Sequence, residues 1–330
     1  MNTNTLDVSI IIVSFNTCDL LRKCLQTVVR EAGEVSYEII VIDNASKDGS
    51  VEMLEREFPE VQLIRSTVNL GFAAANNLGF AQARGHYVVL LNSDAFLKPQ
   101  ALSRSVAYMR ADPKIGVGGA RLVGKEGSWQ PSARMFPSLL NDFLMMSGLA
   151  ARYPQSRFFG RVDRTWTDHN QPALVDWVPG AFSIIPRQVL EQVGYFDEDF
   201  FLYYEEVDLC KRIKAVGYNV WYWPDVEVVH LGGESSKKLK SLNFSPAGKQ
   251  ISLWQMRSAL LYYNKYNGYI SVWLWRQMAN IWYGLRSWKN SLSSQPESQK
   301  KLAYLKMMRG LLRQAWDDTQ GGRVSPPRPW

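Results

Sequence analysis

Short apolar runs without alternation recur through the first half of the chain. Residues 8–15 read VSIIIVSF and residues 37–43 read YEIIVID. Such runs are typical of strands that are covered on both faces. Between the two runs, apolar residues fall at helical spacing: Leu20, Leu21, Cys24, Leu25 and Val28. Strand, helix and strand in this order predict a βαβ unit and therefore a parallel sheet.

The same alternation continues further along the chain. It predicts helices over 50–58, 69–84 and 99–110, and strands over 61–65, 87–91 and 115–123. Residues 125–174 are irregular, and no element is assigned there. Beyond a Pro-Gly turn within 175–185, the pattern predicts helices over 186–193 and 204–216 and strands over 219–223 and 226–230. The chain is therefore predicted to form an open α/β fold.

The last third differs in composition. Seven of the twelve Trp follow Ser236, and residues 237–330 contain 16 Lys and Arg against 3 Asp and Glu. Two helices broken near Asn267-Gly268 and a third over 297–316 are expected. We therefore divide the chain into a domain over 1–236 and a helical, aromatic-rich, basic extension over 237–330.

The basic extension has several interpretations. Trp and Tyr beside Arg and Lys suit the headgroup zone of a membrane, to which the protein would bind peripherally. Aromatic stripes on helices more often form core, so the extension would instead pack on the first domain or form an oligomer contact. A basic surface also suits nucleic acid, but no recognition motif supports that function.

Cysteine usage and the N-terminus indicate a cytoplasmic protein. Cys18, Cys24 and Cys210 form no C-x-x-C pair, so a disulfide framework and a zinc site are both unsupported. The first residues lack the basic segment and cleavage site of a signal peptide. No run reaches the roughly 18 apolar residues that span a bilayer.

Polar clusters follow the predicted strands. Asn92-Ser93-Asp94 ends the strand over 87–91, where such residues form a turn or, at the edge of a parallel sheet, a ligand site. No G-x-G-x-x-G or Walker A sequence follows the early strands, so phosphate would be held differently, for instance by a cation on Asp94.

A second polar cluster opens the helix over 204–216. Its acids, Glu205, Glu206 and Asp208, are explained by the helix dipole alone. However, the aromatic residues just before them would form apolar walls, which raise the pKa of a carboxylate as a general base requires. Periodicity does not choose among the three acids.

Six segments in order carry a family resemblance: VSIIIVSFN (8–16), IIVIDNASKDGS (39–50), NLGFAAANN (69–77), LLNSDAF (90–96), FDEDFFLYYEEVDLCKR (196–212) and VVHLGGES (228–235). Together they resemble the inverting glycosyltransferases of family 2, and most of all the bacterial rhamnosyltransferase-type branch. The resemblance implies a GT-A fold, a Rossmann-like and mostly parallel sheet flanked by helices. A nucleotide sugar and a divalent cation, Mg²⁺ or Mn²⁺, would bind at its strand ends.

The resemblance also implies roles for individual residues. Donor-binding positions are Ser14, Asn16, Asp43, Asn69, Gly71, Asn92 and Ser93. Asp94 and His230 match metal ligands, and Glu206 matches the catalytic base, with Glu205 and Asp208 as supporting acids. Asn92 replaces the first Asp of the family's D-x-D, which removes one negative charge beside the metal. The Glu-Glu pair replaces the Glu-Asp of many relatives, which changes the reach of the base.

The implied reaction moves a sugar from a nucleotide donor to a glycan. The branch suggests dTDP-rhamnose, with a UDP-sugar such as UDP-galactofuranose or UDP-glucose as the alternative. Relatives of this type build surface polysaccharides such as O-antigen. We therefore expect a lipid-linked acceptor at the inner face of the plasma membrane, and no nucleic-acid partner.

Overall fold

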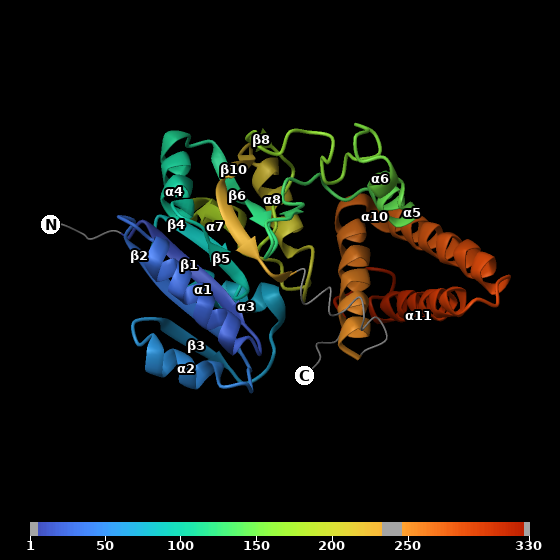
Figure 1. Cartoon of the computed structure of the whole chain (residues 1–330), viewed down its shortest axis with the longest axis horizontal. Coiled ribbons are helices and arrows are strands. Elements are labelled where there is room, and N and C mark those ends of the chain that lie inside the picture. Colours follow the sequence, from blue (N-terminus) through green and yellow to red (C-terminus); the bar gives the residue numbers. More distant parts are fainter. Residues whose placement is uncertain (1–5, 233–245, 327–330) are drawn as a thin grey trace.

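The computed structural model describes residues 6–232 and 246–326. One large sheet with helices on both faces forms the body, and a pair of long helices extends from one end of it (Figure 1). The predicted boundary at Ser236 lies outside the described residues. The α/β class and the C-terminal helical extension are both confirmed.

Four parallel strands form the first half of the sheet. Their spatial order is β3 (Gln62–Ser66), β2 (Tyr37–Asn44), β1 (Val8–Ser14) and β4 (Tyr87–Leu91). Ile10 and Ile12 pack under α1 (Cys18–Glu31), whereas Ile11 packs under α3 (Gly71–Phe80). Both faces of β1 are thus buried, which explains its unbroken apolar sequence.

The second half of the sheet is mixed. β9 (Phe182–Pro186) lies antiparallel between β4 and β6 (Ile115–Val123), and β10 (Asn219–His230) runs parallel to β6. The short strands β5 (Ala95–Leu97), β7 (Trp129–Gln130) and β8 (Ala173–Leu174) pair antiparallel at its margins. The prediction of two separate strands over 219–230 is wrong. A single strand runs through, with a register shift between Trp223 and Glu227, because Pro224 cannot donate to the ladder.

The remaining helices of the body lie close to their predicted positions. They are α2 (Ser50–Glu57), α4 (Ala101–Ala111), α7 (Arg187–Val193) and α8 (Glu205–Ala215). The helix predicted over 69–84 is shorter, since α3 ends at Phe80. In the irregular stretch 125–174 the structure forms α5 (Leu139–Ser147) and α6 (Leu149–Arg152). The hydroxyl of Ser138 accepts the amide hydrogen of Asn141 and caps α5.

The extension consists of α10 (Pro246–Ser291) and α11 (Pro296–Asp318), which pack along each other (Figure 1). Gly268, at φ 76° and ψ 170°, kinks α10, so the predicted break is confirmed. Before the kink, Trp254, Tyr262 and Tyr263 are buried, as the packing interpretation expects. Within residues 6–232 and 246–326, no helix is long and apolar enough to cross a bilayer.

Candidate active site

The turn after β4 and the end of β10 meet at one edge of the sheet. Asn92 accepts the amide hydrogen of Ala95 at 3.0 Å, which closes the turn and starts β5. β5 pairs with β10 so that Ala95 lies opposite His230. His230 Nε2 consequently lies 3.5 Å from Asp94 Oδ1, and also 3.5 Å from Asn92 Nδ2. Three predicted site residues are thereby brought together.

Two contacts orient the ring of His230. Nδ1 lies 3.0 Å from Gln130 Oε1, which only accepts, so Nδ1 donates to Gln130 and Nε2 is the nitrogen that faces Asp94. Gln130 Nε2 in turn donates to the carbonyl of His230 at 2.9 Å. This is how proteins orient a metal-binding histidine. Sequence reasoning missed Gln130, because it comes from the segment in which no element was assigned.

A carboxylate and an imidazole fit a divalent cation that also binds phosphate. Mg²⁺ is commonly held by one or two side chains together with oxygens of the substrate's phosphates. Within residues 6–232 and 246–326, no group of three or more His, Cys, Asp or Glu could hold a metal by itself. Asp94 and His230 would therefore hold a cation jointly with a diphosphate.

Hydroxyl groups line the ends of β1 and β4. Thr17 Oγ1 donates to Ser93 Oγ at 2.9 Å and lies 3.0 Å from Ser14 Oγ. Ser14 is fully buried, so its hydroxyl contacts Thr17 rather than a ligand. Asn16 is in the left-handed region at φ 54°, and its Oδ1 accepts the amide hydrogen of Lys47. Asn16 therefore fixes the loop after β2.

Asp43 ends β2 with an unused acceptor. Its Oδ2 accepts the amide hydrogen of Ser46 at 3.1 Å. Its Oδ1 is buried and has no hydrogen-bond partner in the described part of the chain. A buried carboxylate oxygen without a partner is costly unless a ligand supplies a donor. Asp43 is thus suited to receive a donor group such as the N–H of a nucleobase.

Asn69 and Gly71 are held by a residue that sequence reasoning missed. Asn44 Nδ2 donates to Asn69 Oδ1 at 2.9 Å and to the Gly71 carbonyl at 3.1 Å. Gly71 has φ +84°, and a Cβ there would lie 2.4 Å from the carbonyl oxygen of Phe201. Only glycine fits where α3 meets the loop that leads to the acidic cluster.

A cavity of about 300 Å³ lies at this edge of the sheet. Its lining does not include the predicted residues Ser14, Asn16, Asp43, Glu206 and His230. Five predicted residues line it, namely Asn69, Gly71, Asn92, Ser93 and Asp94. Thr17, Asn44, Phe201 and Leu202 also line it and were not predicted. The volume lies at the lower end of the range of about 300–1000 Å³ for ligand sites.

Glu205 and Glu206 begin α8, three residues beyond the cavity wall at Leu202. Tyr203 and Tyr204, just before them, both have left-handed backbones, at φ 69° and 74°. Two such residues in succession store strain, which is common at functional sites. Burial raises the pKa of both carboxyls, and that of Glu205 further because Glu206 is adjacent. Arg134 and the amide of Gly180 oppose the rise at Glu206. The pair as a whole therefore titrates above the usual range of a carboxyl.

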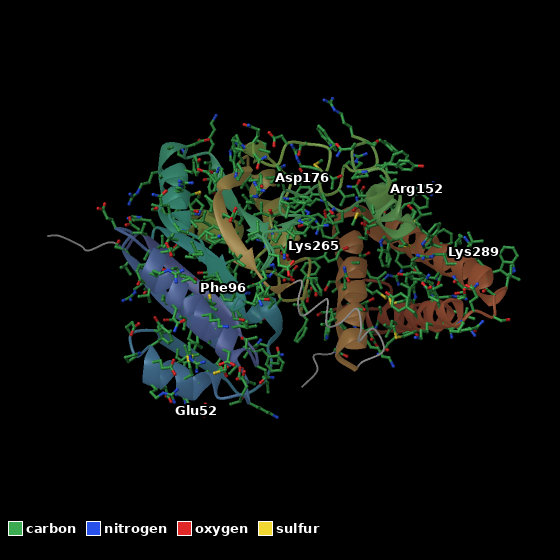
Figure 2. The ribbon with its side chains drawn as sticks, viewed as in Figure 1. Glu52, Phe96, Arg152, Asp176, Lys265 and Lys289 are labelled. Atoms are coloured by element: carbon green, nitrogen blue, oxygen red, sulfur yellow. The ribbon has the colours of Figure 1, made fainter. Side chains whose placement is uncertain are left out.

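Asp208 lies apart from the cavity. It is fully buried, accepts Arg212 Nε at 2.8 Å and contacts Lys265 Nζ at 2.6 Å. Tyr266 also donates its hydroxyl to Asp208 at 2.6 Å. Figure 2 shows Lys265 on the helix that faces the sheet domain. The contacts of Asp208 thus join α8 to α10 rather than reach the cleft.

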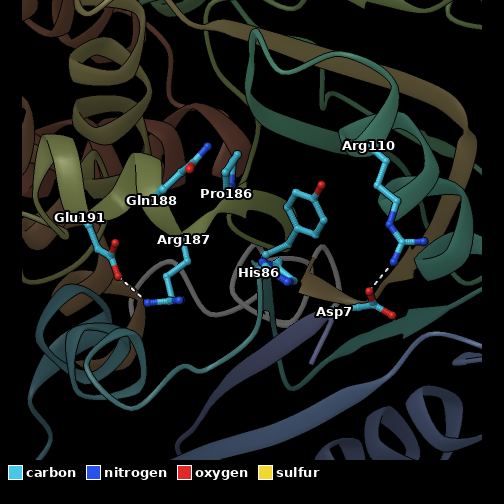
Figure 3. Close-up of a pocket in the computed structure, with 8 residues that line it drawn as sticks. Asp7, His86, Arg110, Pro186, Arg187, Gln188 and Glu191 are labelled. Carbon is cyan, nitrogen blue, oxygen red and sulfur yellow. Dashed lines mark hydrogen bonds and ion pairs between the residues drawn. The ribbon is translucent and has the colours of Figure 1, made fainter. Parts of the chain in front are cut away.

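Another cavity opens at the opposite end of the sheet, before β1 and β4 (Figure 3). It has about 510 Å³ and is lined by Asp7, His86 and Arg187 among others. Arg110 pairs with Asp7, and Arg187 pairs with Glu191. Its charged groups are thus largely paired, and it contains none of the predicted site residues. Ligands of α/β sheets bind at the carboxyl ends of strands, which favours the cavity beside Asp94.

Comparison with known proteins identifies the class. The sequence model of the family "Glycosyl transferase family 2" matches residues 9–194, more than half of the chain. The chain belongs to glycosyltransferase family 2 and has the GT-A fold. It is similar to the mannosyltransferase PcManGT from Pyrobaculum calidifontis, solved in complex with GDP-Man and Mn²⁺. That likeness has a TM-score of 0.53 at 15% identity and covers 96% of this chain and 88% of the other.

Two curated relatives narrow the comparison. The N-acetylglucosaminyl-diphospho-decaprenol L-rhamnosyltransferase of Mycobacterium tuberculosis is 28% identical over 210 residues, which cover 60% of this chain and 68% of the relative. The rhamnosyltransferase WbbL of Escherichia coli is 25% identical over 268 residues, which cover 77% and 92%. The resemblance to the rhamnosyltransferase branch is thereby confirmed.

Proposed function

We propose that the protein is a metal-dependent, inverting glycosyltransferase that moves rhamnose from dTDP-rhamnose to a lipid-linked glycan. The observation that carries this proposal is the meeting of Asp94 and His230, 3.5 Å apart, at the edge of a cavity bordered by the loop to Glu206. Asp94 lines the same cavity as Phe201 and Leu202, which lead directly to Glu206, so a cation and a base would both serve one bound donor.

The nucleotide occupies the ends of β1, β2 and β4. Asp43 accepts a hydrogen bond from the pyrimidine base through its unpartnered Oδ1. Ser14, Asn16 and Asn69 shape the pocket, and Asn92 and Ser93 contact the donor at the cleft. Gly71, at the start of α3, borders the same pocket, where its close approach to Phe201 leaves no space for a side chain.

A divalent cation held by Asp94 and His230 supplies positive charge that stabilises the leaving diphosphate. Glu206 Oε2, which has no hydrogen-bond partner in the described chain, accepts the proton of the acceptor hydroxyl. The acceptor oxygen then bonds to the anomeric carbon while the bond from that carbon to the phosphate oxygen breaks. One displacement inverts the anomeric centre. Glu205, buried beside Glu206 at the start of α8, supports that carboxyl, and burial raises the pKa of both groups.

The donor assignment rests on the relatives. Two of them are rhamnosyltransferases by name, and one acts on a decaprenol-linked acceptor by name. A UDP-sugar is the alternative donor for the same fold. A lipid-linked acceptor places the enzyme at the cytoplasmic face of the membrane, with residues 1–236 as the transferase domain and 237–330 as the part that meets the lipid.

A donor panel tests the proposal. Release of nucleoside diphosphate is measured with dTDP-rhamnose, UDP-glucose, UDP-galactofuranose and GDP-mannose, each with Mg²⁺, with Mn²⁺ and with a chelator. We expect dTDP-rhamnose to be turned over at least tenfold faster than the others, and only with metal. Preference for a GDP-sugar would contradict the nucleotide assignment, and full activity with the chelator would contradict the role of the metal.

A further inference from the structure

The second half of α10 carries apolar side chains on its solvent face. Ile270, Ile281 and Trp288 are 74%, 61% and 66% exposed. Leu274 and Leu285 are exposed as well, and their spacing places all five residues on one stripe. Val272 and Ala279, on the opposite side, are buried within the helix pair. The stripe, defined by these five exposed residues, therefore faces away from the protein.

A basic groove lies beside this stripe, between α10 and α11. Arg276, Asn280, Lys306, Arg309, Gly310 and Arg313 line it, and its volume is about 560 Å³. The lining contains four cationic side chains and no acid, and none of the four makes an ion pair within the described residues. Arg276 Nε is buried there without a hydrogen-bond partner among those residues. The guanidinium of Arg276 also stacks over the Trp316 ring, 4.2 Å from its centroid, which fixes its direction. Converging cations without an ion pair, together with a donor that lacks an acceptor, suit a phosphate group.

Charge extends this pattern over the helix pair. Between residues 269 and 326 the sequence has nine Lys and Arg against three Asp and Glu. Figure 2 places Lys289 on the part of α10 that projects away from the sheet. A second copy of the chain would bring like charges together in a symmetric contact, which opposes pairing through this surface. A free phosphate ion would pair with the cations of the groove, but the apolar stripe would remain exposed to water.

We propose that the stripe and the basic groove together dock the enzyme on a bilayer, with the phosphate of an anionic lipid headgroup in the groove. The stripe lies in the interface between headgroups and acyl chains, where Trp and branched aliphatic residues are stable. Arg276, Lys306, Arg309 and Arg313 then face the phosphate layer. Basic residues near an anionic leaflet each strengthen binding about fivefold.

Contacts within the protein connect this surface to the cleft. Before its kink, α10 stacks Trp254 on Phe201 with ring centroids 4.2 Å apart. Ser258 donates to the carbonyl of Leu202 at 2.8 Å. Phe201 and Leu202 both line the donor cavity. The inference deepens the proposed function, because docking would hold the cleft near an acceptor embedded in the same membrane.

Vesicle co-sedimentation of the full chain tests the inference. Wild type should bind vesicles of phosphatidylglycerol and not those of phosphatidylcholine. The double variant R309E/R313E should bind the anionic vesicles roughly thirtyfold more weakly. The matched control K300E/K301E makes the same charge change on the same helix outside the groove, where Lys301 is already paired with Glu297, and should weaken binding several times less than R309E/R313E. Equal loss in both variants would overturn the assignment of the groove.

A second pair of variants separates the sources of phosphate. I281S/W288S removes apolar contacts from the stripe, and should weaken vesicle binding at least tenfold. The groove would instead be a site for free phosphate if two results coincide: 10 mM inorganic phosphate displaces wild type from vesicles, and I281S/W288S binds vesicles as tightly as wild type. If I281S/W288S changes the oligomeric state by light scattering while vesicle binding stays the same, the stripe is a contact between copies and the inference fails.

The same samples distinguish this inference from the proposed function. Slow release of nucleoside diphosphate from donor in water, without vesicles, should be equal in wild type and R309E/R313E. Vesicle binding without turnover of any nucleotide sugar would support the docking surface and contradict the proposed transferase activity. Turnover without vesicle binding would support the transferase activity and contradict the docking surface.

Discussion

Asp94 and His230 are separated by 136 positions in the sequence, yet strand register makes them neighbours. Leu231 donates its amide hydrogen to the carbonyl of Asp94 at 3.0 Å, which locks the two segments together. Asp43 and Glu206 each keep one buried oxygen without a partner. The free oxygens of Asp43 and Glu206 can therefore accept hydrogen bonds from a bound substrate.

Substitution of Asp94 by Asn should remove metal-dependent binding of the donor nucleotide. The change keeps shape but deletes the only carboxylate of the turn, so calorimetry with dTDP and Mn²⁺ should show affinity at least tenfold weaker. His230→Ala should weaken the same property less, because Asp94 remains. The control Asp19→Asn, at an exposed position on α1, should bind like wild type. An unchanged metal requirement in Asp94→Asn would reject the metal assignment.

Gly71→Ala should destabilise the protein and weaken donor binding together. Both Gly71 and Gly217 have positive φ, but a Cβ meets Phe201 only at Gly71, while nothing lies within 4 Å at Gly217. Gly217→Ala thus measures backbone strain alone. We expect Gly71→Ala to lower the free energy of unfolding by about 1–3 kcal/mol more than Gly217→Ala, by denaturant titration. Equal losses of unfolding free energy in the two variants would show that the loop at Phe201 shifts at little cost to make room for the new methyl group.

At the scale of elements, α5 and α10 meet through one carboxylate. Tyr263 OH and Trp275 Nε1 donate to Asp142 Oδ2 at 2.9 and 2.7 Å. Burial nevertheless raises the pKa of Asp142 to about 6. Sequence reasoning assigned no structure to α5, so this junction was not predicted.

The raised pKa of Asp142 makes the α5–α10 junction sensitive to pH. Because the folded protein holds this proton more tightly than the unfolded chain, its contribution to stability is complete below about pH 4 and is lost as pH rises through about 6. Asp142→Asn should therefore flatten the fall in melting temperature between pH 4 and pH 7. The test is scanning calorimetry of both proteins across that range. Parallel curves would show that Asp142 does not titrate there.

The elements that the sequence predicts well are those determined by the local spacing of apolar residues and glycine. β1, β2 and α1 follow from runs and spacing, and the α10 break follows from Asn267-Gly268, since only glycine readily adopts φ 76°. The rest depends on distant contacts. β5 has only three residues and exists because it pairs with β10. Tyr262 and Trp288 look equivalent in sequence, yet packing buries the first and exposes the second. Thr17 and Asn44 were not predicted as site residues, because they line the cavity only once the ends of β1, β2 and β4 lie side by side.

At the scale of the whole molecule, the extension supports the transferase domain directly. Asp208 of α8 joins Arg212, Lys265 and Tyr266 in a buried network across the two parts. Trp254 and Ser258 hold the loop before the acidic pair. The position of Glu206 thus depends on α10 as well as on the sheet.

Asp208→Asn should therefore act on stability more than on chemistry. It leaves the buried end of Arg212 without its carboxylate, while Lys265 keeps its contact with Asp197, and it should lower the free energy of unfolding by about 3 kcal/mol. Turnover per folded molecule should stay within threefold of wild type. Asp225→Asn, which breaks a surface contact with Arg104 and Tyr108, is the control and should cost less than about 1 kcal/mol. Loss of turnover in a stable Asp208→Asn protein would assign Asp208 to the reaction instead.

Glu206 is proposed to be the base of a sugar transfer from a nucleotide donor, and one comparison of variants tests this most directly. Release of dTDP from dTDP-rhamnose is measured with Mn²⁺ and N-acetylglucosaminyl-diphospho-decaprenol, for wild type, Glu206→Gln and the control Glu52→Gln on the exposed side of α2. We expect turnover by wild type and Glu52→Gln and a loss of about 10²–10⁴-fold in Glu206→Gln, with donor affinity unchanged. Turnover by Glu206→Gln within tenfold of wild type would contradict it.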